Sequence, residues 1–178
     1  MLYTRIPLDR LGVLIGPEGG TKRRLQETSG AKVLVDSETG EVTVDESGAP
    51  DKFLAVKVRD LVHAIGRGFS DERAFRLLDE NSYFVVLDIK DYARTPARIA
   101  QVRARMIGTR GKTRRIVEEL TGAYVSVYGH TVSLIADDLQ LPIAQEALEM
   151  LLRGSEHKTV YRYLERKRAD LKVAEMGF

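Results

Sequence analysis

Cysteine is absent from the 178-residue sequence. This absence excludes a disulfide framework, metal sites built from thiolates and a cysteine nucleophile, and it is compatible with a reducing cytosol. The sequence also lacks any apolar run near the roughly 18 residues that a membrane-spanning helix needs, and its first residues do not have the pattern of a signal peptide. We therefore expect a soluble, cytoplasmic protein with no membrane partner.

Groups suited to catalysis are also scarce. The three histidines, His63, His130 and His157, fall in an apolar helical stripe, a hairpin turn and the C-terminal segment, where structural or solvated roles are the simpler interpretation. There is no metal-ligand spacing, nucleophile motif or Walker-type nucleotide loop, and the adjacent Asp137 and Asp138 suit a loop or a helix cap. We expect no enzymatic activity, no cofactor and no metal; only ATP or GTP binding and turnover would revive an enzymatic interpretation.

The charges that are present are unevenly distributed. The formal net charge is only +2, yet residues 92–115 contain eight basic residues and no Asp or Glu. Residues 36–60, by contrast, contain seven acidic and three basic residues. This segregation is typical of a face that binds a polyanion, although a solvated helix face has the same composition.

One motif occurs twice, ninety-two residues apart. Each copy has an isoleucine before Gly-x-x-Gly (15–19 and 107–111), then a basic segment of helix-forming composition, then Gly-Ala. At this constant offset nine positions are identical: Ile15, Gly16, Gly19, Thr21, Glu27, Gly30, Ala31, Val33 and Val35 match residues 107, 108, 111, 113, 119, 122, 123, 125 and 127. A single Gly-x-x-Gly is usually just a turn, but its duplication with the same flanks indicates a tandem repeat with a function.

The periodicity predicts the same order of elements, β-α-α-β-β-α, in both halves. The predicted strands cover residues 2–8, 32–36, 41–45, 83–89, 123–128 and 131–136. The predicted helices cover residues 11–15, 21–29, 51–67, 96–108, 112–120 and 141–153. The helix over residues 51–67 has an apolar stripe that runs from Phe53 to Ile65, which we expect to face the core. Asp9 and Thr95 are predicted N-caps, Pro96 suits a first helical position, and Gly30 suits a left-handed C-terminal cap.

These elements predict an α+β fold with four parts. The first domain covers residues 1–68, and a helical connector, capped by Ser70 and packed on a domain, covers residues 69–81. The second domain covers residues 82–154, and a basic, helix-prone extension that belongs to neither repeat covers residues 155–178. Each domain is expected to have an antiparallel three-stranded sheet packed by helices.

The repeated loop has the chemistry of a phosphate site. Glycine allows backbone angles and a close approach that a Cβ atom would block. The helix that follows presents unpaired amides and the positive end of its dipole. The sequence therefore predicts two loops that grip a sugar-phosphate backbone.

The second copy, Ile107-Gly108-Thr109-Arg110-Gly111 with Thr121-Gly122-Ala123, resembles the type I KH domain, and residues 15–31 resemble another. Over nearly the whole chain, through residues 5–16, 127–132 and 157–165, the sequence resembles the archaeal two-KH ribosome-assembly proteins, which are related to the eukaryotic Partner-of-NOB pre-ribosomal RNA processing factors. The resemblance implies single-stranded RNA binding, with the loop on the backbone of about four nucleotides and the bases in a groove.

The resemblance also implies a target, partners and contact residues. The expected target is the 3′ region of small-subunit ribosomal RNA during maturation, and the expected partners are an rRNA-processing endonuclease or a translation initiation factor. In the second domain the groove would be walled by Val102, Arg103, Met106, Ile107, Val125 and Val127, and the loop region would comprise Gly108, Thr109, Arg110, Gly111, Lys112, Arg114 and Arg115. The corresponding residues of the first domain are Ile15, Gly16, Pro17, Glu18, Gly19, Lys22 and Arg23.

The two loops differ at one charged position. Glu18 places a carboxylate in the first loop, where Arg110 places a guanidinium in the second. A like charge a few ångströms from a phosphate costs on the order of 1 kcal/mol. The second domain is therefore expected to dominate RNA binding. Two alternatives remain open at this point: a scaffold whose domains contact proteins, and a general single-stranded RNA binder outside ribosome assembly.

Overall fold

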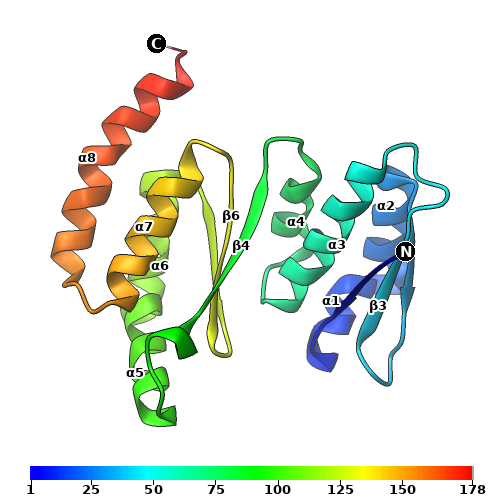
Figure 1. The fold of residues 1–178 in the computed structure, drawn as a ribbon, viewed down its shortest axis with the longest axis horizontal. Coiled ribbons are helices and arrows are strands. Elements are labelled where there is room, and N and C mark those ends of the chain that lie inside the picture. Colours follow the sequence, from blue (N-terminus) through cyan, green and yellow to red (C-terminus); the bar gives the residue numbers. More distant parts are fainter. Residues whose placement is uncertain (178) are drawn as a thin grey trace. The chain divides into compact units, whose positions relative to one another are not determined.

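The computed structural model describes residues 1–177 and contains two units, Met1–Glu80 and a second that begins at Asn81. Each unit has its own three-stranded sheet and its own helices (Figure 1). The predicted mixed fold with two tandem three-stranded units is confirmed. Among the described residues, no helix is both long enough and apolar enough to cross a membrane.

The first unit has the predicted β-α-α-β-β-α order, followed by a short helical segment. Its strands are β1 (Leu2–Arg5), β2 (Lys32–Val35) and β3 (Glu41–Asp45). Its α-helices are α1 (Leu11–Ile15), α2 (Gly20–Ser29), α3 (Lys52–Gly66) and α4 (Asp71–Ala74). Short 3-10 helices occupy η1 (Leu8–Arg10), η2 (Pro17–Gly19) and η3 (Phe75–Leu78).

The sheet of the first unit has the order β1-β3-β2, and β3 pairs antiparallel with both neighbours. Val33, Val42 and Val44 are fully buried, because alternate residues of a strand face the same side. Helix α3 packs on β1 and β3 and contributes the fully buried Leu61 and Ile65. The core of this unit therefore lies between the sheet and α3.

The N-terminal strand is shorter than predicted. It ends at Arg5 rather than residue 8, because Pro7 has no amide hydrogen for the ladder and Leu8 already starts η1. The predicted N-cap at Asp9 is also wrong: Asp9 lies inside η1, and within residues 1–177 no side chain caps η1 or α1.

The apolar stripe predicted for α3 holds except at its start. Phe53 is 54% exposed, and the Lys57 ammonium lies 5.5 Å from the centroid of the Phe53 ring. The helix begins at Asp51, whose carboxylate accepts a hydrogen bond from the Phe53 amide at 2.9 Å. Phe53 therefore lies in the capped first turn, outside the core to which the sequence pattern assigned it.

The predicted connector is helical and packs on its own unit. Helices α4 and η3 lie against α3, and Ser70 caps α4 by accepting a hydrogen bond from the Arg73 amide at 3.3 Å. On the side of α2, the Arg24 guanidinium lies 4.1 Å from the centroid of the Phe75 ring. This segment is therefore part of the compact unit that ends at Glu80.

The second unit repeats the order and adds a long helix. Its strands are β4 (Tyr83–Asp88), β5 (Tyr124–Tyr128) and β6 (Thr131–Ala136). Its α-helices are α5 (Pro96–Ile107), α6 (Lys112–Thr121), α7 (Gln140–Leu152) and α8 (His157–Glu175), and its 3-10 helices are η4 (Ile89–Asp91) and η5 (Thr109–Gly111). The sheet order is β4-β6-β5, again antiparallel throughout.

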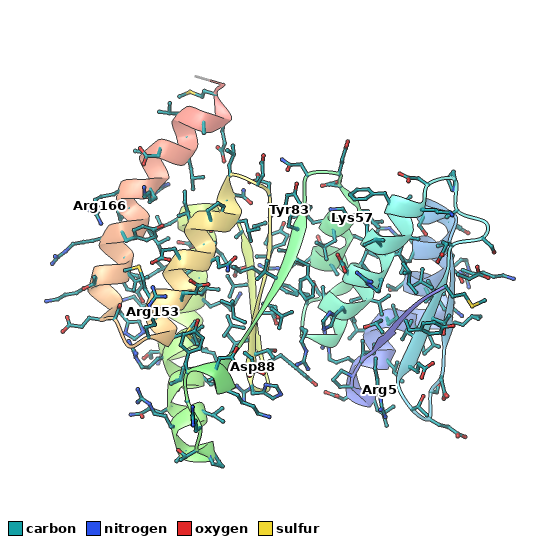
Figure 2. All side chains as sticks on the ribbon, viewed as in Figure 1. Arg5, Lys57, Tyr83, Asp88, Arg153 and Arg166 are labelled. Atoms are coloured by element: carbon teal, nitrogen blue, oxygen red, sulfur yellow. The ribbon has the colours of Figure 1, made fainter. Side chains whose placement is uncertain are left out.

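Local signals set the ends of α5 and of the hairpin. Thr95 caps α5 by accepting a hydrogen bond from the Arg98 amide at 3.2 Å, and Pro96 follows as the first helical residue, as predicted. At the hairpin between β5 and β6, His130 Nδ1 lies 2.9 Å from the Asp88 carboxylate (Asp88 is labelled in Figure 2). Partial burial raises the pKa of Asp88, but hydrogen bonds from the Lys90 amide and from His130 outweigh this effect, so the pKa is lowered overall.

Helix α8 is part of the second unit rather than an addition beside it. It packs on α6 and α7 (Figure 1). Its Val160 and Leu164 are fully buried in the same core as the sheet. The equivalent place in the first unit is taken by α4 and η3, which follow α3 and also contact α2. The sequence assigned this helix to neither repeat because its pattern is not duplicated, but a following helix is common to both units.

His63 gives the first unit an expected pH dependence. Burial, reinforced by the Arg67 and Arg59 guanidinium groups against an opposing effect of Asp60, lowers the pKa of His63 below 6.5. The unfolded chain therefore binds more protons than the folded chain between this lowered value and pH 6.5. We therefore expect the contribution of His63 to the free energy of unfolding to be complete above pH 6.5 and to be lost as the pH falls through that window. His63→Gln should remove this part of the pH dependence when the free energy of unfolding is measured with urea at a series of pH values. The same pH dependence in both proteins would contradict the prediction.

Candidate nucleic-acid interface

The two Gly-x-x-Gly loops have the same backbone conformation. Gly16 and Gly108 have φ angles of 73° and 74°, and Gly19 and Gly111 have 73° and 76°. Between the glycines, Glu18 and Arg110 are the only non-glycine residues with positive φ among residues 1–177, at 53° and 54°. A side chain in this region is unusual and is stabilised by its surroundings. The shared strain indicates that the loop shape itself is a property of the repeat.

The first glycine of each loop is required by close packing. A Cβ atom on Gly16 would lie 2.2 Å from Oγ1 of Thr21, and one on Gly108 would lie 2.3 Å from Oγ1 of Thr113. Both threonines are buried in the first turn of the following helix, α2 or α6. The identical Thr in both repeats is therefore explained by its contact with the loop glycine.

A guanidinium supports the strained residue of each loop. Arg23 donates to the carbonyl oxygen of Glu18 at 3.1 Å, and Arg115 donates to that of Arg110 at 3.2 Å. Within residues 1–177, no side chain caps the N-terminus of α2 or α6. The first amides of these helices and the positive end of the dipole are thus presented beside the loop, which suits a phosphate.

The predicted groove of the first unit is an open hollow of about 440 Å³. The loop and α2 form one side and β2 forms the other. Its lining residues are Ile15, Gly19, Lys22, Arg23, Gln26, Val35 and Ser37. The structure therefore brings together four of the predicted residues of this repeat, Ile15, Gly19, Lys22 and Arg23, and the β2 residue that corresponds to Val127.

The corresponding surface of the second unit contains a carboxylate that the sequence analysis missed. Glu118 occupies the place of Gln26, and it accepts a hydrogen bond from the Val125 amide at 3.2 Å, as Gln26 does from Val33 at 2.9 Å. The other carboxylate oxygen of Glu118 forms a short ion pair with Arg114. Comparison of the two repeats at position 118 would have revealed this difference. Arg114 is therefore less available to a phosphate than predicted.

Three predicted wall residues of the second groove belong to the core. Val102 and Met106 are each 1% exposed and Val125 is 3% exposed, and all three pack in the core of the second unit. Their side chains point into the core and do not face a base, whereas the neighbouring residues of the same helix and strand face outward. Ile107 and Val127 are half-buried and provide the apolar surface beside the loop.

The remaining predicted contacts of the second unit are on the surface. The exposed residues among them are Arg103, Thr109, Arg110, Lys112 and Arg115, while Gly108, Gly111 and Arg114 are half-buried. In the first loop Pro17 and Glu18 are exposed. The sequence placed these residues correctly at the surface, and their contact with RNA stays a prediction.

Substitution of Glu118 by Gln should strengthen RNA binding. Gln26 shows that the amide side chain fits this place and accepts the same strand amide. The change removes a negative charge and releases Arg114 from its ion pair, which is partly buried. If the pair is worth about 1 kcal/mol, we expect affinity for single-stranded RNA to rise by roughly threefold to tenfold. Fluorescence anisotropy at fixed salt measures this. Weaker binding by Glu118→Gln would show that the carboxylate itself contributes to recognition.

Helix α8 braces the second loop. The hydroxyl groups of Tyr161 and Thr113 lie 3.0 Å apart, and in the first unit Thr21 bonds instead to Asp71 of α4 at 2.9 Å. His157, at the start of α8, lies with Nε2 3.0 Å from the carbonyl oxygen of Arg105 on α5. Both helices that flank the loop are thus tied to the helix that follows the repeat.

This bracing was not visible in the sequence. The threonine is identical in both repeats, but its partner is a tyrosine in one and an aspartate in the other.

Among residues 1–177, no group of three or more His, Asp or Glu side chains is arranged to hold a metal ion.

Comparison with known proteins places these features in a family. Residues 83–169 match the family of eukaryotic type KH domains (KH-domain type I), and residues 3–58 match the KH domain family. The match over residues 83–169 extends into α8, consistent with the place of this helix in the core of the second unit. A KH domain-containing protein of Methanocaldococcus jannaschii is 45% identical over 171 residues, which cover 96% of this chain and 75% of that protein.

Solved structures agree with the sequence matches. The crystal structure of Dim2p from Pyrococcus horikoshii has a TM-score of 0.85 and 49% identity over 93% of this chain and 98% of that one. A complex of the same archaeon's Dim2p with the initiation factor subunit a/eIF2alpha and rRNA contains a chain with a TM-score of 0.88 and 48% identity, covering 95% of this chain and 94% of that one. A protein of unknown function from Aeropyrum pernix has a TM-score of 0.91 and 36% identity over 98% and 94%. The duplicated loop, the two folds and these similarities show that the chain belongs to the archaeal two-KH-domain family of ribosome-assembly proteins.

Proposed function

We propose that this protein binds single-stranded ribosomal RNA of the small subunit, mainly through its second unit, and acts in ribosome assembly without catalysing a reaction. The observation that carries the proposal is the second loop. Its strained backbone presents the exposed side chains of Arg110, Lys112 and Arg115 at the uncapped start of α6. Guanidinium and ammonium groups at a helix N-terminus suit a sugar-phosphate backbone.

The groove beside the loop would hold the bases. Ile107 and Val127 offer apolar surface for their faces, and the exposed Arg103 offers a polar group for their edges. KH domains bind about four nucleotides in this manner. The affinity would therefore come mainly from the backbone contacts and the selectivity from the groove.

Ribosomal RNA is favoured as the ligand by similarity. The related Pyrococcus horikoshii protein has been crystallised in a complex with rRNA and a/eIF2alpha. We propose the 3′ region of small-subunit rRNA as the finer target, with a translation initiation factor or an rRNA-processing endonuclease as the protein partner. The protein would hold the RNA in the cytoplasm for another factor to process.

The first unit has the same loop shape with weaker electrostatics. Glu18 projects from its loop, and Gly20 takes the place of Lys112. Its groove, however, has the neutral Gln26 where the second has Glu118. We propose that it contributes a secondary contact.

Crosslinking to RNA in cells followed by sequencing tests the proposed target. Reads should be concentrated at the 3′ region of small-subunit rRNA, and the protein should sediment with immature small subunits. Reads spread over unrelated transcripts would instead favour the general single-stranded RNA binder. Sedimentation with small subunits but no RNA crosslinks would favour the protein scaffold.

A further inference from the structure

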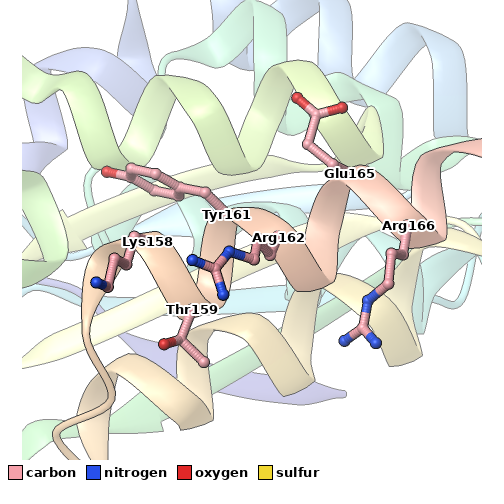
Figure 3. Close-up of a pocket in the computed structure, with 6 residues that line it drawn as sticks. All are labelled: Lys158, Thr159, Tyr161, Arg162, Glu165 and Arg166. Atoms are coloured by element: carbon pink, nitrogen blue, oxygen red, sulfur yellow. The ribbon is translucent and has the colours of Figure 1, made fainter.

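The first half of α8 carries a row of basic side chains. Lys158, Arg162 and Arg166, here called the α8 row, lie one helical turn apart and line an open hollow of about 660 Å³ together with Thr159, Tyr161 and Glu165 (Figure 3). All three basic residues are exposed. Lys158 lies 3.8 Å from the Glu156 carboxylate, while Arg162 and Arg166 form no ion pair within residues 1–177.

The α8 row is continuous with the second Gly-x-x-Gly loop. A second hollow, of about 460 Å³, is lined by the loop residues Gly108, Thr109 and Lys112 and by His157 and Tyr161 of α8. Tyr161 lines both hollows, and its hydroxyl bonds to Thr113 beneath the loop. A strand that leaves the loop on the side of Lys112 therefore reaches the α8 row next.

The first unit lacks this basic surface although it has the same loop. Gly20 stands where the second unit has Lys112, and the helix in the place of α8 presents Asp71 to the loop threonine, followed by the exposed Glu72. Both differences make this side of the second loop more positive. The basic residues of the α8 row are therefore not needed to form the loop, because the first unit forms the same loop without them.

We propose that the α8 row binds the phosphates of nucleotides that flank those held by the second loop. This inference rests on the proposed RNA binding and extends it beyond the groove. Residues 158 to 166 span about 12 Å along the helix, so the row covers a short further stretch of backbone. The occupant is the same RNA strand, because the charge is complementary and the surface is continuous with the loop; base identity would not be read there.

The α8 row predicts a dependence on RNA length. Oligonucleotides from the 3′ end of small-subunit rRNA, starting at the roughly four nucleotides that a KH groove holds, are lengthened one at a time at either end and their affinity is measured. Wild-type affinity should rise on lengthening at one end. Arg162→Glu with Arg166→Glu should lower affinity for the long RNA by roughly twentyfold at 0.1 M salt, from two phosphate contacts on a single strand, and leave the short RNA unchanged.

A matched control comes from the same helix. Arg168→Glu with Lys172→Glu makes the same change of charge at exposed residues outside the hollow and should have a much smaller effect. Wild-type binding to the short RNA verifies the groove independently, so its absence would refute the proposed function itself. Affinity that does not rise with length, or equal losses in both variants, would overturn the α8 row as an RNA site. Loss of a/eIF2alpha binding with RNA binding unchanged would also overturn it, by assigning this face to a protein.

Discussion

Replacing Thr109 and Arg110 together by aspartate should lower affinity for single-stranded ribosomal RNA by about a hundredfold or more. Arg110 would lose a charge-assisted contact worth about 1.5–3 kcal/mol. Two carboxylates near a phosphate would add on the order of 1 kcal/mol each, and each 1.4 kcal/mol is a tenfold change. The measurement is fluorescence anisotropy with an rRNA 3′-end oligonucleotide at fixed salt.

The fold should survive this change. Thr109 and Arg110 are exposed, and aspartate is among the residues that tolerate the positive φ of position 110. Circular dichroism and urea unfolding verify this point. Unchanged RNA affinity in a folded variant would refute the clamp and favour the protein scaffold.

The first loop provides the matched control. Changing Pro17 and Glu18 to aspartate adds only one carboxylate, because Glu18 already carries one. We expect a loss below about tenfold, since one added like charge costs on the order of 1 kcal/mol. An equal or larger loss than at Thr109 and Arg110 would reverse the ranking of the two units.

Leu164→Ala should lower the free energy of unfolding of the second unit by about 2–5 kcal/mol, the usual cost of truncating a buried leucine. Leu164 is 0% exposed and packs in the core formed with the sheet, α6 and α7. Because the chain has two units, urea unfolding should be combined with amide hydrogen exchange to assign the loss to residues of the second unit.

Val173→Ala is the control on the same helix. Val173 is 48% exposed, so its truncation should change the free energy of unfolding by no more than about 0.5 kcal/mol. If Leu164→Ala lowered the free energy of unfolding as little as Val173→Ala does, α8 would not stabilise the unit. In that case the bracing of the second loop through Tyr161 would also lose its basis.

Most of the local structure was predictable because the relevant physical signals are local. Thr95 and Ser70 cap helices as their sequence context indicates, and Gly30 adopts the left-handed conformation expected of a helix C-cap. Asp9 failed as a cap because Leu8 had already begun a 3-10 turn after Pro7. Phe53 failed as a core residue because periodicity cannot tell where along a helix the underlying sheet stops covering it.

The candidate site was predictable in its backbone and only partly in its side chains. The spacing of Gly16 and Gly19, repeated at Gly108 and Gly111, identified both loops, and the structure gives them matching angles. The pairing of Arg114 with Glu118 and the burial of Met106 depend on how a helix and a strand are juxtaposed. Those distances are set by packing and have no signature in one segment of sequence.

By itself, the sequence determined the tandem repeat, the order of elements and the two loops, because glycine positions and apolar periodicity act over a few residues. The tertiary structure alone decided which loop charges are neutralised and that α8 belongs to the second core. It also decided that Tyr161 bonds to Thr113, forty-eight residues away, because the two side chains meet only after α8 packs on α6 and α7. The stretch from Ile107 to Ala123 can be read as an RNA clamp from its residues, but the helix that braces it is visible only in the folded unit.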